Sequence, residues 1–133
     1  MMYEDISYIT KERDLDIHFL LVDLGEKGWR AYILSEIYYK RYSFTRYDNA
    51  NDVHYHLEFD DEMKMKIKNY ANANGILLPY GGEVRYMCWT GQITSLQQMH
   101  SIAAAWCEIT AYYIKHGGNF GSIQDILSKK GII

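Results

Sequence analysis

This sequence has few cysteines, no long apolar run and no excess of positive charge. Its two cysteines, Cys88 and Cys107, match no metal-binding or redox spacing, so we expect both to be reduced thiols packed inside the fold. The longest uncharged stretch, residues 87–107, contains too many polar side chains to span a bilayer. We therefore expect no membrane-spanning segment and no membrane partner.

The charge pattern also lacks a secretory signal and a basic nucleic-acid-binding surface. The sequence starts with Met1, Met2 and Tyr3 and continues directly into Glu4 and Asp5, without the basic start and apolar run of a signal peptide. A cytoplasmic location is therefore expected. The net charge of -3 and the pI near 5.9 supply no long-range attraction to nucleic acid, so any binding of phosphate groups must depend on local cations.

The composition is that of an ordinary globular protein, with 48% hydrophobic and 23% charged residues. A chain of 133 residues can bury a sufficient core without disulfides or metals, so we expect a single domain over residues 1–133. The unusual feature is the tyrosine content, 13 residues. Aromatic rings with a polar tip are favoured on binding surfaces, but codons rich in A and T would raise the tyrosine content without any function. Both origins of the tyrosine content stay open.

Hydrophobic alternation and turn residues predict a hairpin and three further strands. The hairpin covers residues 16–35, and the glycines within residues 25–28 supply the positive φ angles that a tight turn needs. Aromatic stretches over residues 37–47 and 53–59 are separated by a cluster of Asp and Asn that favours a turn. Residues 84–89 follow a glycine pair and complete a predicted sheet of about four to five strands.

The longest predicted helix runs over residues 95–116. Ser95 can cap its first turn while Gln98 returns the bond, and its apolar residues fall on one stripe. Trp106 provides the large contact that would anchor this helix to the sheet. The glycines at residues 117–118 end it.

Two shorter helices are predicted on either side of the last strand. Over residues 60–74, alternating Met and Lys fit a strand, whereas Asp60 as a cap and the closing Gly75 favour a helix. Ser122 is expected to cap a second short helix that extends through Lys130. The predicted class is therefore α+β, a small antiparallel sheet packed against one long C-terminal amphipathic helix, with two shorter helices.

A basic aromatic stretch over residues 38–47 is the densest candidate for binding. On a single strand, its cations and rings would alternate along each face. Aromatic rings stack on bases and arginine forks hold phosphates through two bonds, so the combination suits a nucleotide-like anionic ligand. The alternative is an edge strand whose cations prevent aggregation while its rings pack on neighbouring strands. The predicted ligand-binding residues are Tyr39, Lys40, Arg41, Tyr42, Phe44, Arg46 and Tyr47.

A histidine pair offers a second candidate, a metal site. His54 and His56 lie two residues apart on a predicted strand and point the same way, and with Asp60 they could coordinate one metal ion. The residues that follow do not reproduce the Asp and His of the binuclear metallohydrolase pattern, which favours a solvent-facing pair. No catalytic set and no cofactor are expected, because neither cysteine lies at a helix N-terminus and the glycine pairs lack the lysine and spacing of a phosphate-binding loop.

These observations favour a non-enzymatic binding protein that uses residues 38–47 to bind a nucleotide-like anionic ligand or a partner protein. A small metal-dependent hydrolase that uses His54, His56 and Asp60 is the first alternative. A self-associating structural module, such as a homodimer with a symmetric tyrosine interface, is the second. Small chains of this kind are common among accessory proteins of phages and mobile elements, including inhibitors of bacterial defence, and we hold that association as a hypothesis.

Overall fold

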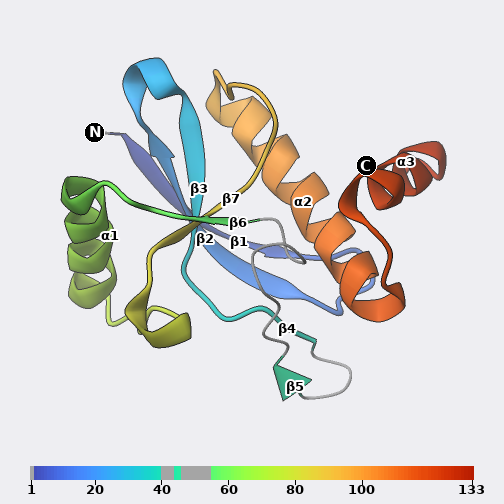
Figure 1. Ribbon diagram of the computed structural model, residues 1–133, viewed down its shortest axis with the longest axis horizontal. Helices are drawn as coiled ribbons and strands as arrows, with labels where there is room; N and C mark the ends of the chain where they lie inside the picture. The colour runs from blue at the N-terminus through green and yellow to red at the C-terminus, as the bar shows by residue number, and fades with distance from the viewer. Residues whose placement is uncertain (1, 40–43, 46–54) are drawn as a thin grey trace.

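A five-stranded antiparallel sheet forms the centre of the molecule, with its strands in the order β1-β2-β3-β7-β6. The computed structural model describes residues 2–39, 44–45 and 55–133 (Figure 1). The strands of this sheet are β1 (Tyr3–Ile9), β2 (Asp16–Asp23), β3 (Trp29–Ile33), β6 (Tyr55–Leu57) and β7 (Arg85–Met87). A separate antiparallel pair consists of β4 (Tyr38–Tyr39) and β5 (Phe44–Thr45).

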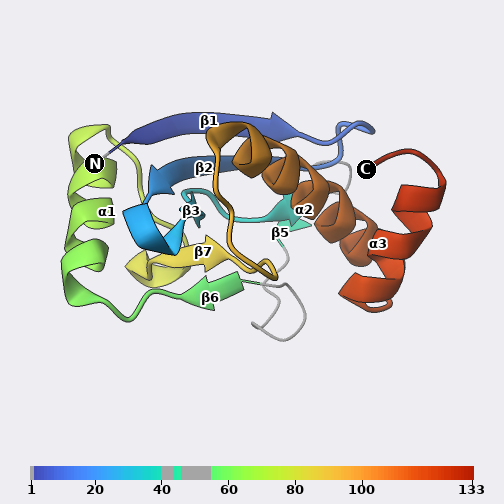
Figure 2. The ribbon, with the colours of Figure 1, turned by 90° about the horizontal axis from the view of Figure 1, so that it is seen from above.

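Helices cover both faces of the sheet, so the molecule has three layers (Figures 1 and 2). Helix α1 (Asp61–Ala73) packs on one face and α2 (Leu96–His116) packs on the other. The third helix, α3 (Phe120–Lys129), packs against the C-terminal half of α2. The predicted α+β class is confirmed, with five strands in the sheet, one long C-terminal helix and two shorter helices.

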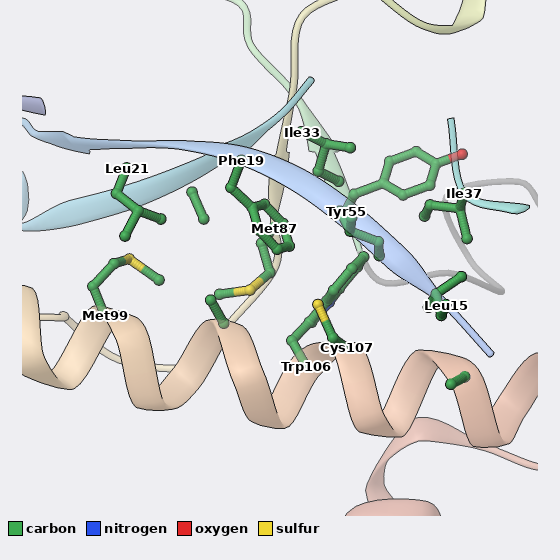
Figure 3. Close-up of a cluster of buried hydrophobic side chains, with 14 of the residues drawn as sticks. Leu15, Phe19, Leu21, Ile33, Ile37, Tyr55, Met87, Met99, Trp106 and Cys107 are labelled. Atoms are coloured by element: carbon green, nitrogen blue, oxygen red, sulfur yellow. The ribbon is translucent and has the colours of Figure 1, made fainter. Parts of the chain in front are cut away.

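Alternation along the strands produces two hydrophobic cores, one on each face of the sheet. In β2, Phe19 and Leu21 face α2, whereas Leu20 and Val22 face α1. Trp106 of α2 is completely buried, and the centre of its ring lies 6.2 Å from that of Phe19 (Figure 3). The expectation that Trp106 anchors the long helix to the sheet is therefore confirmed.

The predicted hairpin over residues 16–35 is formed by β2 and β3, which are joined through a short 3₁₀ turn, η1 (Gly25–Lys27). Gly28 follows this turn with a φ of 82°, and a Cβ at that position would lie 2.5 Å from the carbonyl oxygen of Ile93. The backbone N–H of Trp29 donates to the same carbonyl at 2.8 Å. Glycine therefore lets the loop that follows β7 approach the start of β3.

Residues 60–74, whose alternation also fitted a strand, form a helix as predicted. The Asp60 carboxylate accepts a hydrogen bond from the backbone N–H of Glu62 at 2.9 Å. At the other end, Gly75 has a φ of 67° and the N–H of Ile76 donates to the carbonyl of Ala71 at 2.8 Å. These two caps satisfy terminal backbone groups of α1, and so they outweigh the two-residue alternation of Met and Lys.

The N-terminal caps of the other helices agree only partly with the prediction. Ser95 accepts from the N–H of Gln98 at 3.1 Å, but the Gln98 side chain accepts from the N–H of Thr94 at 2.9 Å rather than from Ser95. The predicted cap of α3 is wrong, because Asn119 accepts from the N–H of Ser122 at 2.8 Å and places Ser122 inside the first turn. Asn caps a helix as well as Ser does, so the earlier residue begins the helix.

The β predictions need three corrections. Residues 37–47 were expected as one strand, but Tyr38 pairs with Thr45 and Tyr39 pairs with Phe44, so the stretch contributes two antiparallel strands. Among the described residues, the strand predicted over residues 53–59 ends at Leu57, and the strand predicted over residues 84–89 covers only Arg85–Met87. The edge strand β1 was not predicted at all.

Candidate functional site

Of the predicted ligand-binding residues, the structure describes only the backbones of Tyr39 on β4 and Phe44 on β5. The other members, Lys40, Arg41, Tyr42, Arg46 and Tyr47, lie outside the described residues. Ligand binding by this stretch therefore stays a prediction.

The structure describes two of the three residues of the predicted metal site, and neither is placed to bind a metal. His56 on β6 has an exposed side chain, and its ring centre lies 5.5 Å from that of Tyr86. Asp60 uses its carboxylate to cap α1. His54 lies outside the described residues. Within residues 2–39, 44–45 and 55–133, no three His, Cys, Asp or Glu side chains lie close enough together to hold a metal ion.

The two cysteines are free, and the structure places neither in a reactive environment. Cys107 is buried in the α2 core and Cys88 is half-buried. Burial raises the pKa of both thiols above the usual value. A raised pKa keeps a thiol protonated at neutral pH, so both cysteines have the inert, packing role that the sequence predicted.

A pocket of about 250 Å³ opens between β3 and β7. Only one residue pair, Tyr32 with Tyr86, joins these two strands, and the loop after β7 returns to the sheet only at Ile93, where it binds Trp29. The Gln92 side chain also donates to the carbonyl of Glu26, which holds this loop against η1. The residues that line the pocket are Lys27, Trp29, Arg30, Ala31, His56, Tyr86, Met87, Trp89, Gly91 and Ile93.

The charge of this pocket has one sign. Lys27 and Arg30 contribute positive charge and His56 contributes an imidazole, while none of the described residues that line the pocket is Asp or Glu. The whole chain carries a net charge of -3, so a lining without carboxylates is a local departure from the composition. Cations in a concave site attract anions strongly at short range, where solvent and salt screen them least.

Arg30 is the best-positioned cation of the pocket. One terminal nitrogen of its guanidinium donates to the Glu58 carboxylate at 2.9 Å, and the central carbon lies 4.3 Å from the centre of the Tyr86 ring. A guanidinium has five N–H donors, and the hydrogen bonds of Arg30 to Glu58 and to the Tyr32 hydroxyl use only part of them. The stacking on Tyr86 fixes the plane of the guanidinium, so its remaining donors have a defined direction.

Glu58 is the buried support of this arrangement. Its side chain is only 6% exposed, and the Tyr32 hydroxyl donates to the same carboxylate oxygen as Arg30, at 2.6 Å. The backbone N–H of Asp60 donates to the other oxygen at 3.1 Å. Burial raises the pKa of Tyr32, and its bond to Glu58 raises the pKa further, so this hydroxyl stays a donor at neutral pH. The buried carboxylate is thus paired and hydrogen-bonded, as burial of a charge requires.

A second pocket, of about 280 Å³, adjoins the first at Lys27 and Arg30. It differs in charge, because carboxylates of Asp23, Asp60 and Glu62 line it together with the cations. This mixture favours no ligand of one sign. The pocket between β3 and β7 is therefore the better candidate for an anion.

Two rings of the pocket belong to half-buried residues, Tyr86 and Trp89. The Trp89 ring packs edge-on against Phe120 of α3, with ring centres 6.4 Å apart. Such contacts hold a ring in place while part of its surface stays accessible. The pocket therefore combines cations with positioned rings, the chemistry that the sequence predicted for residues 38–47.

The sequence did not indicate this site because its residues come from η1, β3, β6, β7 and the loop after β7. One signal was available within the hairpin. Arg30 stands between the apolar residues Trp29 and Ala31 on a strand whose other residues are buried. A cation at such a position needs a buried partner, and Glu58, the residue that directly follows β6, is that partner.

Comparisons with protein-family models, with curated proteins and with solved structures find no match for this chain. The geometry defines its class, an α+β protein with helices on both faces of an antiparallel sheet. No helix in the described part of the chain has both the length and the apolar character needed to cross a membrane.

Proposed function

We propose that this protein is a non-enzymatic binding protein that holds a small anionic ligand with a planar ring, such as a nucleotide, in the pocket between β3 and β7. The observation that carries the proposal is the pocket itself, in which Lys27, Arg30 and His56 meet without a carboxylate among the described lining residues. Tyr86 and Trp89 would provide ring surface for stacking, and the Arg30 guanidinium would hold a phosphate or carboxylate.

A thermal-shift series with matched compounds tests both parts of this chemistry. AMP carries a ring and a phosphate, adenosine carries the ring alone, and ribose 5-phosphate carries the phosphate alone. A ligand that binds only the folded state raises the melting temperature, so AMP should raise it more than either partial compound. Cyclic dinucleotides and other nucleotides extend the series. If no anionic ring compound raises the melting temperature, the proposal is wrong.

Removing an exposed cation and an exposed imidazole should weaken binding without unfolding the protein. Lys27→Gln combined with His56→Gln leaves Arg30 and Glu58 paired, because both substituted side chains are exposed. We expect the Kd for AMP, measured by calorimetry, to rise about tenfold or more, since each lost charge-assisted contact costs about 1.5 kcal/mol or more. The melting temperature without ligand should change little.

Two further variants distinguish binding in this pocket from binding elsewhere on the molecule. Lys129→Gln makes a similar charge change at an exposed position on α3 and should leave the Kd unchanged. Arg41→Ala with Arg46→Ala tests the basic aromatic stretch. Loss of binding in the Arg41 and Arg46 variant, with full binding in the Lys27 and His56 variant, would move the site from the pocket to residues 38–47.

A further inference from the structure

β1 forms an outer edge of the sheet, and none of the described strands pairs with its outer side (Figure 2). Seven residues long, it contains no proline and no lysine, and its register with β2 is continuous without a bulge. Proteins usually protect an exposed edge with such a feature, with charged side chains or by making the strand short. The two charged side chains of β1, Glu4 and Asp5, are bound by His100 and His18 of the same chain. The opposite edge strand, β6, has three residues in the described part of the chain. The unprotected edge of β1 is therefore suited to pair with another strand.

The hydrogen bonds at the two ends of β1 show which backbone groups face outward. The carbonyl of Met2 accepts from Asp23, and the N–H of Thr10 donates to Leu15, so the even-numbered residues direct their backbone groups toward β2. Backbone groups alternate along an antiparallel strand. The residues that direct N–H and C=O toward the free edge are Tyr3, Asp5, Ser7 and Ile9.

We propose that β1 pairs with β1 of a second copy of this chain, antiparallel and about a two-fold axis at Ile6. In this register Tyr3 faces Ile9 of the other copy and Asp5 faces Ser7, so every outward residue joins a pair that exchanges two backbone hydrogen bonds. Tyr3 and Ile9 are 56% and 49% exposed in the single chain, and their pairing would cover both. An aromatic ring opposite a β-branched side chain is a favourable cross-strand pair.

The side chains that face each other favour this register over the two registers in which the two-fold axis is shifted by one residue. An axis at Asp5 would place the two Asp5 carboxylates opposite each other, which is destabilising. An axis at Ser7 would place Asp5 against Ile9 and leave Tyr3 without a cross-strand partner. The axis at Ile6 avoids both problems and uses the whole edge. The resulting dimer is closed, because each copy uses its only long free edge among the described strands.

Light scattering coupled to size-exclusion chromatography measures the oligomeric state of the full chain. The expected mass is twice the 15.6 kDa of one chain. Ser7→Pro removes an outward N–H without touching the β1–β2 hydrogen bonds, so it should give a monomer with an unchanged circular dichroism spectrum. Ser7→Ala keeps the N–H and should stay dimeric. A monomeric unmodified protein at every concentration, or a dimer that survives a folded Ser7→Pro variant, would overturn the proposal.

Cysteine cross-linking tests the register independently of Ser7→Pro. In a Cys88→Ala background, Ile6→Cys places two thiols on the two-fold axis, where facing Cα atoms lie about 4.5 Å apart and a disulfide can form. Ser7→Cys is the matched control, because its Cα atoms would lie more than about 7 Å apart. Oxidation should link the Ile6→Cys chains only. Linkage through Ser7→Cys instead would contradict the axis at Ile6. This interface does not involve the pocket at Arg30, so either proposal can fail without the other.

Discussion

The carboxylate of Asp5 connects three elements of the fold through two hydrogen bonds. Its oxygens accept from His18 Nε2 on β2 and from the Tyr70 hydroxyl on α1, each at 2.5 Å. Partial burial alone would raise the pKa of Asp5, but the hydrogen bonds from Tyr70 and His18 outweigh burial and lower it. The bond to Asp5 in turn raises the pKa of Tyr70 to about 12. Asp5 thus fastens α1 to the edge of the sheet.

Tyr70→Phe should produce a pH-dependent loss of stability. The pKa of Tyr70 in the folded state lies above the value of about 10 expected when unfolded, so its contribution is complete below pH 10 and is lost as the pH rises toward 12. We expect the variant to lose about 1 kcal/mol of unfolding free energy at neutral pH, measured with urea, and the difference to shrink between pH 10 and 12. Asp5→Asn is the control, because Tyr70→Phe in that background should show a much weaker pH dependence. A difference that stays constant through pH 12 would contradict this role.

Several tyrosines have structural roles that account for part of the high tyrosine content. Tyr32 is completely buried and donates to Glu58. Tyr55 is 4% exposed, and its hydroxyl accepts from the Arg85 guanidinium at 2.7 Å. Tyr8 donates to the buried Glu108 at 2.7 Å. Packing and hydrogen bonding, rather than a shared binding surface, explain these residues.

At the scale of elements, α2 is held by an apolar contact and by a buried carboxylate. Trp106 fills the space under the sheet beside Phe19, while Glu108 lies two residues further along the helix. Glu108 is 8% exposed, and it accepts from the Tyr8 hydroxyl and from the backbone N–H of Lys11 at 3.0 Å. The carboxylate therefore fixes the end of β1 and the following turn against the helix.

Trp106→Ala should remove the largest fully buried side chain between α2 and the sheet. Because the side chain is fully buried, the loss combines transfer of the ring to water with the cavity that remains, about 3 to 5 kcal/mol in unfolding free energy. Urea denaturation followed by circular dichroism measures this loss. Trp106→Phe keeps an aromatic ring and should lose less. A loss below about 1 kcal/mol for the alanine variant would mean that Trp106 does not anchor the helix.

At the scale of the whole molecule, the sequence predicted the elements whose signals are local. Gly25 and Gly28 indicated the hairpin, and the caps at Asp60, Gly75 and Ser95 indicated two helices with nearly correct ends. Each signal depends on neighbouring residues only, and so sequence alone contains it. The α+β class followed from combining these elements.

The remaining features depend on contacts between distant residues. In β1, the adjacent acids Glu4 and Asp5 interrupt the alternation of apolar and polar residues that indicates a strand. Their partners are distant in sequence, since Glu4 binds His100 and Asp5 binds His18. The candidate pocket needs Arg30 of β3 and Tyr86 of β7 to meet, and it needs Glu58, which follows β6, to bind Arg30. Strand order is set by packing across the whole molecule, which the local pattern does not specify.

The measurement that tests the central claim most directly is an NMR titration of the nitrogen-15-labelled protein with AMP. We expect the amides of Arg30, Tyr86 and Gly91 and the indole N–H of Trp89 to shift together, while the indole of the buried Trp106 stays unchanged. Shifts confined to residues 38–47, or no shifts at all, would contradict a binding pocket between β3 and β7.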